Sequence, residues 1–116
     1  MNRLDFETIT TELLEKTKEI RTHKGNEYSN NADVFKSFND LSTASCTRYD
    51  VLRIFLAKHI SAINTACASL NGSVDAQTLE GLSEPIEGRI SDAINYLLLL
   101  HGMLQEIKPK KQDYPL

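Results

Sequence analysis

The sequence predicts an all-α fold, a small helical bundle of three long helices and one short helix. Apolar residues recur every three or four positions, which is the spacing of one helix face, and no stretch alternates like a strand. The stretches GNEYSNNA and NGSVDAQTLEGLS are rich in Gly, Asn and Ser and are expected to be loops. A length of 116 residues fits one domain, expected over 1–108, followed by a flexible C-terminal tail over 109–116.

The first helix is expected over residues 6–23 and a shorter second helix over 33–44. Asp5 can cap the first helix, and Gly25 is its expected stop. The residues expected to point inward are Phe6, Ile9, Leu13, Thr17 and Ile20 in the first helix, and Val34, Phe35, Phe38 and Leu41 in the second.

The third helix has the clearest signals. Thr47 and Asp50 form a variant of the capping box, with Asp in the usual Glu position, and a broad apolar stripe then continues to Leu70. The stripe includes His59. The residues predicted to be buried in the third and last helices are His59, Ile63, Ile90 and Leu97.

The last helix is expected to begin with Ser83 as its N-cap and Pro85 in its first turn. It should end near Ile107, because Pro109 cannot continue a helix. After Tyr96 it is apolar on every side, which is typical of a helix in the centre of a bundle.

The first half of this last helix contains several polar residues. A stripe at 100° per residue consists of Glu84, Gly88, Ser91 and Asn95, flanked by Glu87 and Asp92. One interpretation is a solvated face; the other is that the stripe faces helices or a cleft. We predict that Asp92 and Asn95 face Lys58 or His59 rather than open solvent. In the second case a carboxylate must be paired or bind a cation, because an isolated buried charge costs several kcal/mol. The small Gly88 then indicates the close approach of a helix or ligand.

Further candidate residues lie outside the last helix. His59 is on the apolar face of its helix, where it is either a core histidine or part of a site, and Lys58 beside it is either a surface lysine or a phosphate ligand. The first loop adds Lys24 and Tyr28, and Tyr28 with Phe35 offers aromatic surface that suits stacking on a base.

Composition excludes several classes of function. The net charge of −3, with both signs spread along the chain, gives no basic field for duplex nucleic acid. Cys46 and Cys67 show neither metal-ligand spacing nor a disulfide framework, so a cytoplasmic location is expected. The start MNRLDFETIT lacks the apolar core of a signal peptide, and no run is long enough to cross a membrane.

No nucleophile elbow, P-loop, CxxC or HExxH motif is present. Carboxylates at helical spacing, without His or Cys in metal-ligand spacing, favour an oxygen-binding cation such as Mg²⁺ over zinc. Mg²⁺ is therefore the expected cofactor if there is one.

The order KGNEY…DVFKSF, then KH, then EPIEGRISDAINYLLLL resembles phage and prophage proteins of the nucleotide modification associated domain 1 type. Those proteins are similar to the all-α NTP pyrophosphatases of the MazG-like group. The resemblance covers residues 24–104. Its most specific part is the series Glu84, Pro85, Ile86, Gly88, Arg89, Ile90, Asp92, Asn95 and Tyr96.

The resemblance implies a homo-oligomeric helical protein that handles nucleotides, with Mg²⁺ as a possible cofactor. In the pyrophosphatases, carboxylates on helices hold a metal that activates water against an α–β phosphoanhydride. Carried onto this chain, the implied metal ligands are Glu84, Glu87 and Asp92, with Glu27 as a further candidate, and Glu87 and Asp92 are the implied catalytic residues. The implied nucleotide-binding residues are Lys24, Tyr28, Lys58, His59, Arg89, Asn95 and Tyr96.

The chain departs from the pyrophosphatase pattern in one respect. That pattern pairs ExxE on one helix with ExxD on the next, but the last helix here carries Asp92 and the neutral Asn95. An ExxE does occur at Glu12 and Glu15, on the side of the first helix away from its apolar face. The departure weakens the expectation of hydrolysis more than that of nucleotide binding.

Three hypotheses therefore remain open. The first is a Mg²⁺-dependent nucleotide pyrophosphohydrolase of phage type, which uncompensated clustered acids would favour. The second is a non-catalytic sponge that sequesters a host antiviral nucleotide signal, favoured if the acids are matched by Lys58, His59 and Arg89. The third is a helical interaction module whose polar stripe is an interface between subunits.

Overall fold

The computed structural model describes residues 1–28, 33–70, 80 and 85–108, with the backbone alone for 25–28. The expected C-terminal tail lies outside the described residues. The described part contains no strand, and its three long helices and one short helix confirm the all-α prediction. The helices are α1 (Arg3–Tyr28), α2 (Lys36–Leu41), α3 (Arg48–Ser69) and α5 (Ile86–Ile107).

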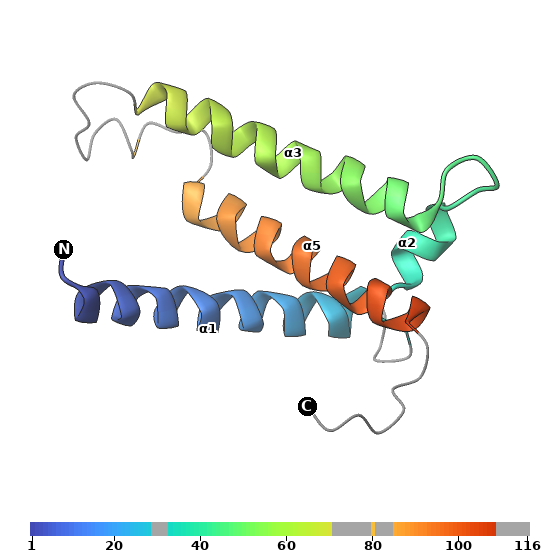
Figure 1. Cartoon of the computed structure of the whole chain (residues 1–116), viewed down its shortest axis with the longest axis horizontal. Coiled ribbons are helices and arrows are strands. Elements are labelled where there is room, and N and C mark those ends of the chain that lie inside the picture. Colours follow the sequence, from blue (N-terminus) through green and yellow to red (C-terminus); the bar gives the residue numbers. More distant parts are fainter. Residues whose placement is uncertain (29–32, 71–79, 81–84, 109–116) are drawn as a thin grey trace.

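The helix α5 lies between α1 and α3 (Figure 1). It packs mainly against α3 and less extensively against α1, while α2 packs against α3. The chain directions of α3 and α5 are antiparallel, and those of α1 and α5 are parallel, as the colours in Figure 1 show. The side chains of α5 therefore meet one neighbouring helix on each of two sides.

The most buried part of the protein lies where α2 meets α3 and α5. Its buried members are Phe35, Phe38, Val51, Leu52 and Met103. The rings of Phe38, Phe55 and Tyr96 extend this cluster, with centroids 6.1 to 6.3 Å apart. This core joins three helices and holds α3 and α5 in register.

The predicted capping box begins α3. The backbone N–H of Asp50 donates to Thr47 Oγ1 at 3.3 Å, and the backbone N–H of Thr47 donates to Asp50 Oδ2 at 3.0 Å. Two N–H groups that the helix itself cannot satisfy thus find partners. This local interaction fixes the start of the helix that carries Lys58 and His59.

Replacing Thr47 with alanine is expected to lower the free energy of unfolding by about 1 kcal/mol, because one N–H at the start of α3 loses its acceptor. Urea unfolding followed by circular dichroism measures this. Thr65→Ala, at an exposed position near the C-terminal end of the same helix, is the control. An equal loss in both variants would contradict a capping role.

Two helix boundaries differ from those predicted. Gly25 does not end α1, which continues to Tyr28. The second helix is shorter than the predicted 33–44. Before it begins, the Asp33 carboxylate accepts the backbone N–H of Phe35 at 2.9 Å, and after it ends the backbone of Ser42 is extended. Ser83, the predicted N-cap of the last helix, lies outside the described residues, and Pro85 precedes the first helical residue.

The burial predictions are only partly confirmed. Phe35 and Phe38 are buried, and His59, Ile63 and Ile90 are half-buried. The prediction for Leu97 is wrong, since its side chain is exposed, as are Phe6, Ile9, Val34 and Leu41. The physical reason for Leu97 is that, among the described helices, α1 and α3 cover two sides of α5 and leave the side of Leu97 open. None of the described helices combines the length and apolar character that a membrane span requires.

Candidate functional site

The polar stripe of α5 faces α1, which accounts for its Ser and Asn. Thr17 and Ser91 are buried, with their hydroxyl oxygens 3.1 Å apart. Thr17 donates to the Leu13 carbonyl at 2.7 Å, so its oxygen can accept the hydroxyl hydrogen of Ser91. One turn later, Asn95 donates to the carbonyl of Thr17 at 3.2 Å and accepts from Arg21 at 3.1 Å. These bonds satisfy the buried polar groups and set the register of α1 on α5.

This geometry corrects two expectations. Asn95 was expected to face Lys58 or His59 on α3, but its amide faces α1 instead. The small size of Gly88 was attributed to the close approach of a helix or ligand, but a Cβ atom there would meet nothing within 4 Å in the described part of the chain, so no described helix approaches it closely. The approach of a ligand stays a prediction. Arg21 was not predicted as a site residue, although it lies one turn after Thr17 on the same side of α1 and could have been found from that spacing.

Asp92 lies at the junction of α1, α3 and α5. Its carboxylate is 3.5 Å from Lys24 Nζ on α1 and 3.7 Å from His59 Nδ1 on α3, and its side chain is 26% exposed. The prediction that Asp92 faces His59 rather than open solvent is confirmed. The carboxylate keeps enough exposure to be reached by a small molecule.

The imidazole of His59 is held on two sides. Arg89 Nη1 lies 3.3 Å from His59 Nδ1, and because a guanidinium only donates, Nδ1 is the acceptor and Nε2 carries the hydrogen. The ring stacks on Tyr96, with centroids 5.4 Å apart and planes inclined by 29°. Arg89, His59 and Tyr96 thus form one connected group.

The electrostatic surroundings keep His59 neutral. Burial is the largest influence and lowers the pKa of His59; Asp92 raises it, while Arg89, Lys58 and Lys24 each lower it. The contact between His59 and Asp92 is therefore not a charged pair at neutral pH, and Lys24 is the cation that balances this carboxylate. Burial, followed by the charge of Asp92, raises the pKa of Tyr96.

Several cations act on His59. Among the described residues, Lys24, Lys58 and Arg89 act on its charge together with the carboxylate of Asp92. Lys58 is exposed and forms no ion pair within the part of the chain that the structure describes. Cations gathered at one place in the described part of a protein of net charge −3 are suited to attracting an anion.

The predicted metal ligands do not converge in the described residues. Glu87 pairs with Lys16 at 3.8 Å on the exposed surface, apart from Asp92. Glu84 and the side chains of Glu27 and Tyr28 lie outside the described residues. No group of three or more His, Cys, Asp or Glu that could hold a metal occurs among those described.

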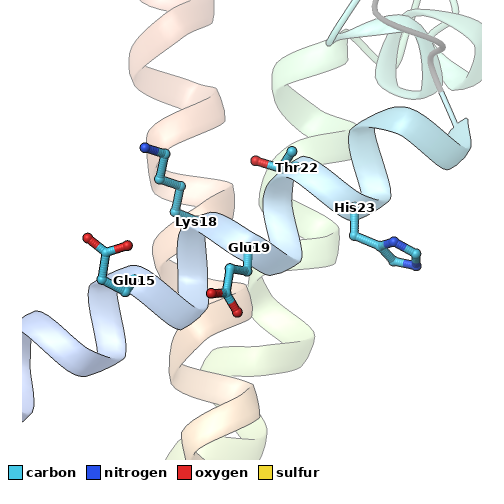
Figure 2. Close-up of a pocket in the computed structure, with 5 residues that line it drawn as sticks. All are labelled: Glu15, Lys18, Glu19, Thr22 and His23. Atoms are coloured by element: carbon cyan, nitrogen blue, oxygen red, sulfur yellow. The ribbon is translucent and has the colours of Figure 1, made fainter.

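The ExxE motif formed by Glu12 and Glu15 lies on the exposed outer side of α1. Figure 2 shows a shallow hollow on this helix, with α5 and α3 passing behind it. The hollow contains none of the cations around His59. Its lining residues are Glu15, Lys18, Glu19, Thr22 and His23.

Lowering the pH below about 6.5 is expected to destabilise the protein through His59. The unfolded chain takes up a proton there at the ordinary histidine pKa of about 6.5, whereas the folded chain resists protonation because its pKa is lowered. Urea unfolding at pH 7.5 and 5.5 should show the wild type losing more of its free energy of unfolding than His59→Gln. Equal losses in the two proteins would contradict a lowered pKa.

Comparison of the chain with protein-family models, with curated proteins and with solved structures found no match. The geometry of the site therefore carries the functional argument.

Proposed function

We propose that the protein binds the phosphate of a nucleotide, or of a small molecule derived from one, without hydrolysing it. The observation that carries the proposal is that, among the described residues, three cations gather beside His59 and the carboxylate of Asp92. These cations are Lys24, Lys58 and Arg89. Arg89 can hold a phosphate through two parallel hydrogen bonds, and lysines add point charge. The stacked pair of His59 and Tyr96 lies beside these cations. These features together match the charge and the planar base of a nucleotide.

The pairing of the carboxylates with lysines favours binding over hydrolysis. Mg²⁺-dependent hydrolysis needs several carboxylate oxygens directed at one metal. Asp92 is paired with Lys24, and Glu87 with Lys16, on different sides of α5. Carboxylates that are paired with lysines in this way support the sponge hypothesis, in which a phage protein sequesters a host nucleotide signal in the host cytoplasm. The pyrophosphohydrolase, with Mg²⁺ on Glu84, Glu87 and Asp92, is the alternative that experiment must separate from it.

The proposal includes assembly of identical chains, as the sequence resemblance implies. The side chains that support it are large apolar residues left exposed on α5 and α3.

A thermal-shift screen of nucleoside triphosphates and cyclic dinucleotides, with and without Mg²⁺, tests the proposed function. A ligand that binds only the folded state adds about 2.7 kcal/mol at 100 times its dissociation constant, a readable shift for a domain of this size. The expected result is stabilisation without Mg²⁺ by at least one nucleotide. No shift with any member of the panel would overturn the proposal.

Asp92→Asn then separates binding from hydrolysis. In a binder the change should alter affinity modestly, and neither protein should release phosphate or pyrophosphate. In a pyrophosphohydrolase, Mg²⁺-dependent release by the wild type should fall by orders of magnitude in the variant, because a neutral amide is a poor Mg²⁺ ligand. Calorimetric titration and an assay for released phosphate, after treatment with an added pyrophosphatase, provide the two measurements.

A further inference from the structure

Arg21 on α1 is a cation that no carboxylate balances in the described part of the chain. Its Nη1 donates to Asn95 Oδ1 at 3.1 Å, and the Asn95 amide in turn donates to the carbonyl of Thr17 at 3.2 Å. The side chain of Arg21 is half-buried and forms no ion pair among the described residues. A neutral amide holds a guanidinium in place without neutralising it, so Arg21 keeps its full positive charge.

The neighbouring cation on α1 differs in this respect. Lys24 lies one turn after Arg21, and its charge is balanced by the Asp92 carboxylate, 3.5 Å from Nζ. Residues three positions apart are neighbours on a helix surface, which holds both for these two cations and for their partners Asp92 and Asn95 on α5. Of the two positive charges along this contact between α1 and α5, a described carboxylate therefore balances one.

Asp92 separates this pair of cations from those near His59. One carboxylate oxygen of Asp92 faces Lys24 on α1, and the other lies 3.7 Å from His59 Nδ1 on α3, which accepts from Arg89 at 3.3 Å. A phosphate placed directly against Asp92 would meet a charge of its own sign. The site therefore offers two separate positions to phosphate, one beside Arg89 and one beside Arg21.

We propose that Arg21, together with Lys24, binds a second phosphate of the ligand, so that the bound molecule carries at least two phosphates. This inference rests on the proposed function, in which Arg89 and Lys58 bind the first phosphate. The guanidinium of Arg21 has more N–H donors than its bond to Asn95 uses, so donors remain for phosphate oxygens.

The neutral side chain of Asn95 keeps Arg21 available for this second phosphate. An aspartate at position 95 would hold Arg21 in the same place but would neutralise it, and a phosphate would then compete with a carboxylate for the guanidinium. Asn95 thus sets the register of α1 on α5 and leaves the charge of Arg21 to the ligand. Arg21 also precedes residues 24–104, which the sequence resemblance covers, so the resemblance does not imply this role.

Calorimetric titration with AMP, ADP and the adenylate dinucleotide pApA, all without Mg²⁺, tests the inference. AMP carries one phosphate, ADP two adjacent phosphates, and pApA two phosphates on separate nucleotides. The wild type should bind ADP or pApA about tenfold more tightly than AMP, because a second charge-assisted contact forms. The probe that gains shows whether the two positions take adjacent or separate phosphates.

Arg21→Gln should remove this gain and leave the affinity for AMP unchanged. Arg3→Gln is the matched control, since it removes the same charge from an exposed position on the same helix and should change none of the three affinities. Circular dichroism of each variant shows whether the helices are intact. If Arg21→Gln unfolds, Arg21→Lys replaces it and should lose part of the gain, because lysine cannot form two parallel bonds to a phosphate.

Asn95→Asp separates phosphate binding from a purely structural role of Arg21. A carboxylate would hold Arg21 at least as firmly as the amide does, so a structural role predicts that the gain persists. The proposal predicts that the gain is lost although Arg21 is still present. An unchanged affinity for AMP in this variant shows that the rest of the site is intact after the loss of the Asn95 bond to Thr17.

Two-phosphate probes that bind no more tightly than AMP would overturn the inference. So would an Arg21→Gln protein that keeps the gain of the wild type. The proposed function is read separately, from the nucleotide screen and from Arg89→Lys, which should weaken the binding of all three probes. A protein that binds AMP through Arg89 but gains nothing from a second phosphate would keep the proposed function and lose this inference alone.

Discussion

Replacement of Leu52 by alanine is expected to lower the free energy of unfolding by about 3 to 4 kcal/mol. Its side chain is 1% exposed and lies in the core shared by α2, α3 and α5. The variant loses the burial of three carbon atoms and leaves a cavity that the neighbouring rings of Phe35 and Phe38 fill only in part. Against a typical total of 5 to 15 kcal/mol, such a loss is a large part of the stability.

Equilibrium unfolding in urea measures this change. Leu14→Ala is the matched control, since it makes the same chemical change at an exposed position on α1 and should alter stability by less than about 0.5 kcal/mol. Similar losses at the two positions would show that the core has been placed wrongly.

Replacement of Arg89 by lysine is expected to weaken nucleotide binding at least tenfold, which corresponds to about 1.4 kcal/mol. Lysine keeps the positive charge but cannot form two parallel bonds to a phosphate. It also loses the guanidinium geometry that lets Arg89 donate to Nδ1 of His59 at 3.3 Å. The helical content should not change, because Arg89 lies outside the buried core.

Calorimetric titration of the best ligand from the nucleotide screen measures the effect. Arg53→Lys provides the control, since this exposed arginine pairs with Asp50 near the start of α3, apart from the site. Unchanged affinity in Arg89→Lys, with ligand still bound, would place the phosphate elsewhere.

Local signals in the sequence were sufficient to predict most of the fold. Thr47 and Asp50 interact within one turn, so the start of α3 could be predicted without knowing any other helix. The end of α1 could not be predicted in this way. A glycine within a helix costs about 1 kcal/mol, which other interactions of the helix can offset. A helix can therefore end at Gly25 but does not have to end there.

The candidate site was predicted only in part, because a helical wheel shows which residues share a side but not which neighbour lies against that side. Asp92 and Asn95 were correctly placed on an inward-facing stripe. Asp92 reaches both neighbouring helices, whereas the hydrogen bonds of Asn95 among the described residues go to α1. The same limitation explains Leu97: an apolar surface predicts burial, but the helices in the described part of the chain leave this side chain uncovered.

The most direct test of the phosphate site is the pKa of His59, measured by NMR from its ring resonances with and without saturating nucleotide. The free protein should show a pKa below the usual histidine value of about 6.5, because of burial and the charges of Arg89, Lys58 and Lys24. A bound phosphate adds negative charge beside the ring and should raise that pKa, so binding should tighten as the pH falls towards it. A nucleotide that saturates the protein while leaving the His59 pKa unchanged would contradict the proposed site.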